Sequence, residues 1–130
     1  CLGNFRQYFS DPSVHLDYSC GLLDTGRYYI LFDRLMAHWR QVFPGRIHEV
    51  SYEALVVSQE AISRELVEHC GLSWNDACLH FERNPSAVAT MSAQQVRQPM
   101  YRSSIGQWKH YERELTDLHK LLQDAGLDGR

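Results

Sequence analysis

Residues 22–43 read LLDTGRYYILFDRLMAHWRQVF. Bulky apolar residues recur in this stretch every three or four positions, at Tyr28, Phe32, Leu35, Trp39 and Val42. This spacing places them on one face of an α-helix and predicts a long helix over Leu22–Phe43. Pro44 and Gly45 predict its end, because proline has no amide hydrogen for the helical ladder and glycine accepts a left-handed turn.

The segments around this helix predict a mostly helical α/β chain. Arg46–Val50 is expected to form a short strand, and the succession of helix, turn, strand and helix is typical of an α/β layer. A capping box at Ser104 predicts a helix that carries Trp108 and Lys109. The other expected helices are Cys1–Phe9, Ser58–Cys70, a short one from the Ser73 capping box to Phe81, and Leu115–Ala125.

Length and composition narrow the class of protein. The 130 residues suffice for one domain, and 13 Lys and Arg against 16 Asp and Glu give a net charge of −3, which excludes a general nucleic-acid-binding surface. No apolar run approaches the about 20 residues of a membrane span. The four cysteines form no CxxC pair, so we expect reduced thiols, a cytoplasmic protein and no metal site. Because the first residue is Cys1 rather than Met, we expect a piece of a longer polypeptide.

The stretch from Arg83 to Tyr111 contains no Asp or Glu but carries Arg83, Arg97, Arg102 and Lys109. Much of it shows no helical or strand period, and long loops inside compact domains are usually functional. One interpretation is an anion site, in which these cations converge where a capped helix begins at Ser104. The other is a solvated loop with ordinary arginines, and the sequence leaves both open.

Three further residues have roles that the pattern alone does not decide. Ser104 is expected to be a helix N-cap, and the Ser103 hydroxyl could reach an oxyanion. Tyr52 follows the expected strand, whose carboxyl end faces the ligand crevice in α/β sheets. A tyrosine there can stack on a purine, although a buried ring with a satisfied hydroxyl is the more common outcome.

Five stretches, taken in order, resemble one protein family. They are GRYYILFDRLMAHWR at 26–40, PGRI at 44–47, VSYEALV at 50–56, CGLSW at 70–74 and VRQPMYRSSIGQW at 96–108. Together they resemble the C-terminal half of bacterial sulfotransferases, which are often fused to tetratricopeptide repeats and are related to protein-tyrosine sulfotransferases. The resemblance covers nearly the whole chain.

This resemblance implies a P-loop-kinase-like α/β fold, of which residues 1–130 form a single partial domain. Such enzymes transfer a sulfuryl group from 3′-phosphoadenosine 5′-phosphosulfate to a hydroxyl or amine, and no metal is expected. Tyr52 matches the adenine-contacting tyrosine of the family, and residues 92–101 match its nucleotide-covering loop. The positions implied to bind the donor are Arg6, Tyr52, Ser92, Gln95, Val96, Arg97, Tyr101, Arg102, Ser103, Ser104, Gly106 and Lys109.

The chain also departs from the family pattern. The 5′-phosphosulfate loop, the general base and one arginine of the 3′-phosphate site are expected in a missing N-terminal half. Gly3 stands where that site has a serine, for which Asn4 or Arg6 can substitute, and Gln107 stands where some relatives have lysine. We therefore assign no catalytic residue, and we expect the isolated chain to be inactive.

Two alternatives remain open. A non-catalytic helical interaction module would use the apolar helix faces to bind a partner. A nucleotide-kinase-like relative would share the layer but transfer a phosphoryl group, for which it would need carboxylates to hold Mg²⁺. The acceptor, which could be a protein tyrosine, a sugar or a small molecule, is not readable from these residues.

Overall fold

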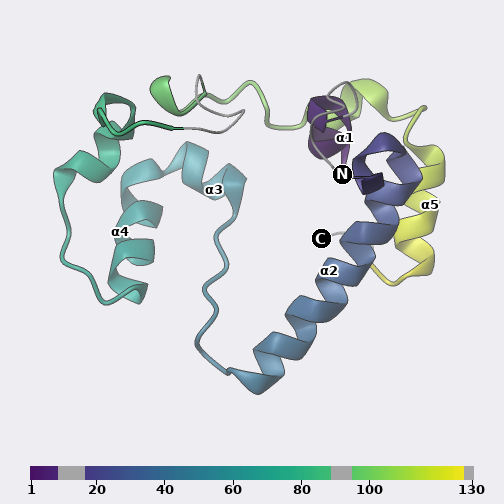
Figure 1. Ribbon diagram of the computed structural model, residues 1–130, viewed down its shortest axis with the longest axis horizontal. Coiled ribbons are helices and arrows are strands. Elements are labelled where there is room, and N and C mark those ends of the chain that lie inside the picture. Colours follow the sequence, from purple (N-terminus) through teal and green to yellow (C-terminus); the bar gives the residue numbers. More distant parts are fainter. Residues whose placement is uncertain (9–16, 89–94, 128–130) are drawn as a thin grey trace. The chain divides into compact units, whose positions relative to one another are not determined.

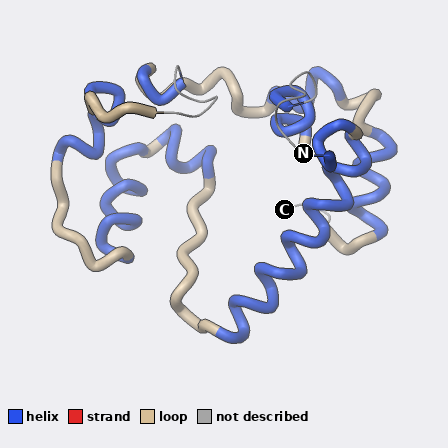
Figure 2. The backbone as a smooth tube through the Cα atoms, viewed as in Figure 1, coloured by secondary structure: helices blue, strands red, loops and turns tan. Residues whose placement is uncertain are grey.

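The computed structural model describes residues 1–8, 17–88 and 95–127. Within these ranges the predicted mostly helical character is confirmed, and Figure 2 shows only helices and loops in them. The chain divides into two compact units: a first unit of residues 1–47 and 106–130, and a second unit of residues 48–105. No helix in the described ranges is long and apolar enough to cross a membrane.

The first unit is built around the long helix α2, Leu22–Val42, with α5, Thr116–Asp124, packed beside it (Figure 1). The two helices pack tightly against one another at Gly26. A Cβ atom on this residue would lie 2.5 Å from Leu118 Cδ1 and 3.0 Å from Leu121 Cδ2. Leu118 is buried at this contact. The packing of α5 on α2 therefore depends on position 26 being a glycine, which has no side chain.

Two short helices pack against the beginning of α2: α1, Leu2–Tyr8, and the 3₁₀ helix η1, Asp17–Cys20. Thr25 is only 2% exposed, and its hydroxyl oxygen lies 3.0 Å from the carbonyl oxygens of both Tyr18 and Gly21. The Tyr18 ring stacks on the Tyr28 ring, with centroids 3.9 Å apart and an interplanar angle of 7°. These contacts fix η1 to the first turns of α2.

The predicted long helix is confirmed. Its C-cap is Phe43, whose amide donates to the Trp39 carbonyl oxygen at 2.8 Å, and Gly45 follows with φ of 72°. The predicted apolar face is also present, but the described residues leave it exposed. Its members, each more than one third exposed, are Tyr28, Phe32, Leu35, Trp39 and Val42.

The described part of the second unit contains two α-helices, α3, Tyr52–Val57, and α4, Gln59–His69, and two 3₁₀ helices, η2, Asp76–Arg83, and η3, Gln95–Arg97. The Gln59 side-chain amide donates to the Leu79 carbonyl oxygen at 3.4 Å. The Arg64 Cζ atom lies 4.1 Å from the Trp74 ring centroid. These contacts hold α4 against η2 and against the loop that precedes it.

The predicted strand at Arg46–Val50 is wrong: Figure 2 shows this segment as a loop. A strand is stabilised by hydrogen bonds to a second strand, and the described residues contain no strand that could pair with it. A helix that the sequence did not predict follows directly. It is α3, which begins because the Ser51 hydroxyl oxygen accepts a hydrogen bond from the Ala54 amide at 3.2 Å.

Both predicted capping boxes are wrong. The cap of η2 is Asn75 rather than Ser73, since the Asn75 Oδ1 atom accepts from the Ala77 amide at 2.8 Å. The helix predicted after Ser104 is the five-residue 3₁₀ helix η4, Gln107–Tyr111. It starts after Gly106, whose φ of 68° interrupts any helix running from Ser104.

The other predicted helices are confirmed apart from their ends. The structure places them at α1, α4 and α5, within one residue of the predicted bounds. Phe9, the last residue of the first of these predictions, lies outside the described residues.

Candidate functional site

The C-terminal end of α1 contacts η4, although the two segments are far apart in the sequence. Arg6 Nη1 donates a hydrogen bond to Gln107 Oε1 at 3.2 Å, across 101 positions. The Arg6 Cζ atom also lies 5.5 Å from the Tyr111 ring centroid. One residue of η4 therefore accepts from the guanidinium while another provides an aromatic surface for it.

The beginning of η4 holds two more of the predicted donor-binding positions: Gly106 is its N-cap, and Lys109 lies within it. The Lys109 amide donates to the Gly106 carbonyl oxygen at 3.0 Å. A Cβ atom on Gly106 would lie 3.9 Å from Lys109 Cδ and Cε, so the Lys109 stem lies against this glycine. The Lys109 ammonium is 5.9 Å from the Trp108 ring centroid. Through Gln107, the structure brings Arg6 beside η4, which carries Lys109.

The electrostatic setting of this turn is mixed. Lys109 and Arg113 line one shallow hollow together with Glu112 and Glu114. These two carboxylates lower the positive potential on that side of η4. Arg6 and Gln107 do not line this hollow, so their contact is the place that we consider for an anion. It is not a helix N-terminal site, because η4 has only five residues and begins without a side-chain cap.

In the second unit, Tyr52 is the first residue of α3, and 44% of its surface is exposed. Its position follows from the Ser51 cap, which fixes the first turn of α3. An exposed ring at the start of a short helix can stack on a flat ligand. The structure therefore contradicts the buried interpretation of this tyrosine.

Arg97 ends η3 and has a partner within the second unit. Its guanidinium donates to the Ser86 carbonyl oxygen and so joins the two ends of the segment between them. This contact gives Arg97 a structural role in the loop. A guanidinium has five N–H groups, so the contact leaves donors for a second partner.

The remaining predicted positions of the second unit follow η3. Arg102 and Tyr101 are exposed, Val96 is partly buried, and a turn closes where the Ile105 amide donates to the Arg102 carbonyl oxygen at 3.0 Å. Ser103 and Ser104 belong to this turn, so Ser104 is not a helix cap. Ser92 and the side chain of Gln95 lie outside the described residues.

The predicted positions thus fall into two groups, each within one unit. The first-unit group is joined by the Arg6–Gln107 contact and consists of Arg6, Gly106 and Lys109. The described second-unit group consists of Tyr52, Val96, Arg97, Tyr101, Arg102, Ser103 and Ser104. Gln107 is a residue that the sequence did not select, because nothing local in the sequence marks a partner 101 positions away.

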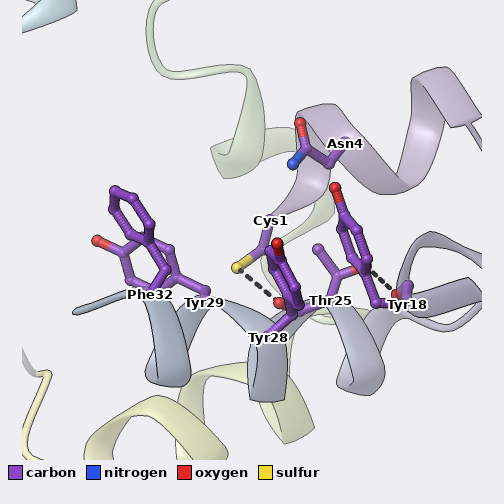
Figure 3. A pocket seen from close by; sticks show the side chains of 7 residues that line it. All are labelled: Cys1, Asn4, Tyr18, Thr25, Tyr28, Tyr29 and Phe32. Atoms are coloured by element: carbon purple, nitrogen blue, oxygen red, sulfur yellow. Dashed lines mark hydrogen bonds between the residues drawn. The ribbon is translucent and has the colours of Figure 1, made fainter. Parts of the chain in front are cut away.

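The sequence also did not indicate a cavity of about 240 Å³ at the beginning of α2 (Figure 3). Its lining residues are Cys1, Asn4, Tyr18, Thr25, Tyr28, Tyr29 and Phe32. The Cys1 thiol lies 4.0 Å from the Thr25 carbonyl oxygen, to which it donates a hydrogen bond. Among the described side chains, no three potential metal ligands lie together.

Comparison with known proteins identifies the class of this chain. The model of the sulfotransferase family matches residues 1–76. An uncharacterized protein of Aquifex aeolicus (strain VF5) is 34% identical over 124 residues, which are 95% of this chain and 16% of that protein. No solved structure matches.

The chain therefore belongs to the sulfotransferase family, as its motifs predicted. It spans about a sixth of the length of the Aquifex relative.

Proposed function

We propose that this chain is the donor-nucleotide-binding part of a sulfotransferase that uses 3′-phosphoadenosine 5′-phosphosulfate. Family membership supports sulfuryl transfer in general. The observation that carries the nucleotide-binding role is the contact between Arg6 and Gln107. It brings an arginine of the first helix beside the glycine–tryptophan turn, and both segments are expected to bind the donor.

The chemistry of the first-unit group fits a phosphate. The Arg6 guanidinium uses one N–H on Gln107 and keeps others for oxyanions, with which it forms short charge-assisted hydrogen bonds. Gly106 carries no side chain, so a ligand can approach the backbone of the turn. Lys109, which lies within η4, adds a second positive charge. We assign a donor phosphate to this group. Arg6 takes the role of the serine that the family has at the position of Gly3.

The second-unit group supplies residues of complementary chemistry. The exposed Tyr52 ring is assigned to the adenine, which has a flat face for stacking. We assign the guanidinium of Arg102 and the hydroxyls of Ser103 and Ser104 as hydrogen-bond donors to phosphate or sulfate oxygens. No carboxylate occurs between Arg83 and Tyr111, so no acidic side chain of that stretch repels the ligand.

These residues bind and orient the donor rather than carry out the transfer. The bound donor supplies the sulfuryl group, and positioning together with charge neutralisation accelerates its transfer to a hydroxyl or amine. The phosphosulfate loop and the general base are assigned to a preceding half with a P-loop-kinase-like α/β fold. We place the whole protein among the bacterial, tetratricopeptide-associated sulfotransferases of the cytoplasm.

One observation favours a second candidate, a non-catalytic interaction module. The apolar face of α2, from Tyr28 to Val42, is exposed in the described structure. Exposed apolar surface of this kind is typical of a docking face. Such a module would bind a partner through α2 and would have no affinity for a nucleotide.

Calorimetry with adenosine 3′,5′-bisphosphate and the full-length protein distinguishes the two functions. We expect saturable binding that persists in EDTA, because sulfuryl transfer from this donor needs no Mg²⁺. The Arg6→Gln variant should bind about 10- to 100-fold more weakly, as expected for loss of a charge-assisted contact of about 1.5–3 kcal/mol. Arg27→Gln is the matched control, because Arg27 lies on the same unit and pairs with Asp24 at 2.7 Å. Absence of binding in the unmodified protein would favour the interaction module.

A further inference from the structure

The first turn of α3 carries Tyr52, the residue assigned to the adenine. The side chains at this end of the helix, Ser51, Tyr52 and Glu53, are all exposed in the described structure. Val56, one turn later, is only 7% exposed and anchors the other end. With six residues, α3 is far shorter than the about 12–15 residues that an isolated helix needs to be stable in water. The first turn therefore depends on local hydrogen bonds.

Two side-chain hydrogen bonds meet at the Ser51 hydroxyl. Its oxygen accepts from the Ala54 amide at 3.2 Å, which satisfies one of the amides that a helix leaves without an intrahelical partner. The same hydroxyl donates to Glu53 Oε2 at 3.3 Å. Because a hydroxyl group can rotate, this donation keeps a lone pair of the oxygen directed at the amide. Glu53 thus acts on the start of α3 through Ser51.

The helix that follows provides an internal comparison. α4 also begins after a serine, Ser58, but the Ser58 side chain makes no capping hydrogen bond. Both serines therefore precede a helix of the same unit, and only Ser51 caps its helix with the side chain. Ser58 is the matched control for every experiment on Ser51.

We propose that Ser51 and Glu53 are positioning residues for recognition of the adenine. Glu53 orients the Ser51 hydroxyl, and the Ser51 cap holds Tyr52 in the helical position from which its ring stacks on the base. The inference rests on the proposed function, in which Tyr52 binds the adenine. Loss of the cap leaves the ring intact but leaves the ordered first turn populated only in part, and the affinity for the base falls with that fraction.

Calorimetry on the full-length protein tests this inference with adenosine 3′,5′-bisphosphate and uridine 3′,5′-bisphosphate. The two probes carry the same phosphates and differ in the base, and the larger purine stacks more strongly on an aromatic ring. The ratio of their affinities therefore measures recognition of the base, whereas a general effect on the fold weakens both probes alike. We expect the unmodified protein to prefer the adenosine probe at least about fivefold, and Tyr52→Leu to lose most of this preference.

Ser51→Ala should lower the preference for adenosine at least about threefold, the size expected for the loss of an N-cap. Ser51→Thr should restore it, because threonine also caps helices. Ser58→Ala should change the preference less than about twofold, since that side chain makes no cap. In the Tyr52→Leu background, Ser51→Ala should cause no further loss, because both act on one interaction.

Two variants of Glu53 separate its hydrogen bond from its charge. The side-chain oxygen of glutamine still accepts from the Ser51 hydroxyl, whereas alanine offers no acceptor. We expect Glu53→Ala to lower the preference at least about threefold and Glu53→Gln to lower it less than about twofold. This pair decides the question if Ser51→Ala fails to fold.

The outcomes distinguish this inference from the proposed function. An unchanged preference in Ser51→Ala, or an equal loss in Ser58→Ala, would overturn the role of Ser51 while nucleotide binding stands. Equal losses in Glu53→Ala and Glu53→Gln would overturn the role of the Glu53 hydrogen bond. Equal affinity of the unmodified protein for both probes would overturn base recognition by Tyr52 and this inference, with phosphate binding intact. Binding of neither probe would overturn the proposed function and this inference together.

Discussion

Gly26 of α2 lies directly against Leu118 of α5, so close that a Cβ atom would come within 2.5 Å of the leucine Cδ1 atom. This contact joins the two largest helices of the first unit. Because Leu118 is buried and Leu121 stands only slightly farther away, neither leucine can move far without opening a gap. The contact is therefore a sensitive point for the stability of the unit.

Gly26→Ala should destabilise the protein. Overpacking costs about 1–3 kcal/mol and exceeds the about 0.5–1 kcal/mol that alanine gains over glycine in a helix. Gly3→Ala is the control, because nothing lies within 4 Å of a Cβ atom at this helical position, and it should stabilise slightly. Thermal unfolding followed by circular dichroism measures both, and a higher Tm for Gly26→Ala would show that α5 does not pack as described.

Replacing Gln107 by glutamate should weaken phosphate binding. The new carboxylate would form an ion pair with Arg6 and neutralise the charge that we assign to the ligand. We expect adenosine bisphosphate to bind about tenfold more weakly, corresponding to about 1.4 kcal/mol. Gln123→Glu makes the same charge change on α5, away from η4. Calorimetry at low and moderate salt measures the effect, and an equal loss in both variants would attribute it to net charge alone.

Arg102→Ala should weaken bisphosphate binding while leaving the fold intact. The side chain is exposed in the described structure, and a charge-assisted contact is worth about 1.5–3 kcal/mol, or about 10- to 100-fold in affinity. Arg83→Ala is a suitable control from the same acid-free stretch, because Arg83 Nε already lies 3.5 Å from Glu82. Unchanged affinity of Arg102→Ala in calorimetry would remove Arg102 from the site.

Residues 1–130 alone should not transfer sulfate. The groups assigned here bind and orient the donor, and none of them is assigned the proton transfer or the phosphosulfate contacts. An assay with radiolabelled donor and a panel of phenols, sugars and amines measures this. Turnover above the uncatalysed rate would contradict the assignment and would require a general base among the described residues.

The sequence predicts well those features that depend on local spacing. The long helix follows from the recurrence of apolar residues between Tyr28 and Val42, and its end follows from Pro44 and Gly45. Caps are less predictable, because several polar residues compete for them. Asn75 takes the place expected for Ser73, and the positive φ of Gly106 removes the helix expected after Ser104.

Features that depend on distant residues could not be predicted. A strand at Arg46–Val50 requires a partner strand, which its own residues cannot supply. The Arg6–Gln107 hydrogen bond and the stacking of Tyr18 on Tyr28 arise only once separate helices have packed. Family resemblance selected Arg6 and Gly106 individually, whereas their proximity emerged only from the structure.

The division of the first unit between both ends of the chain affects the order of events on the ribosome. The contact between Gly26 and Leu118 can form only after Leu118 has been synthesised, about 5–20 s after Gly26 at about 5–20 residues per second. The second unit is continuous in sequence and can form earlier. During that interval α5 does not yet cover the apolar residues of α2. We therefore expect a chaperone to bind this nascent segment.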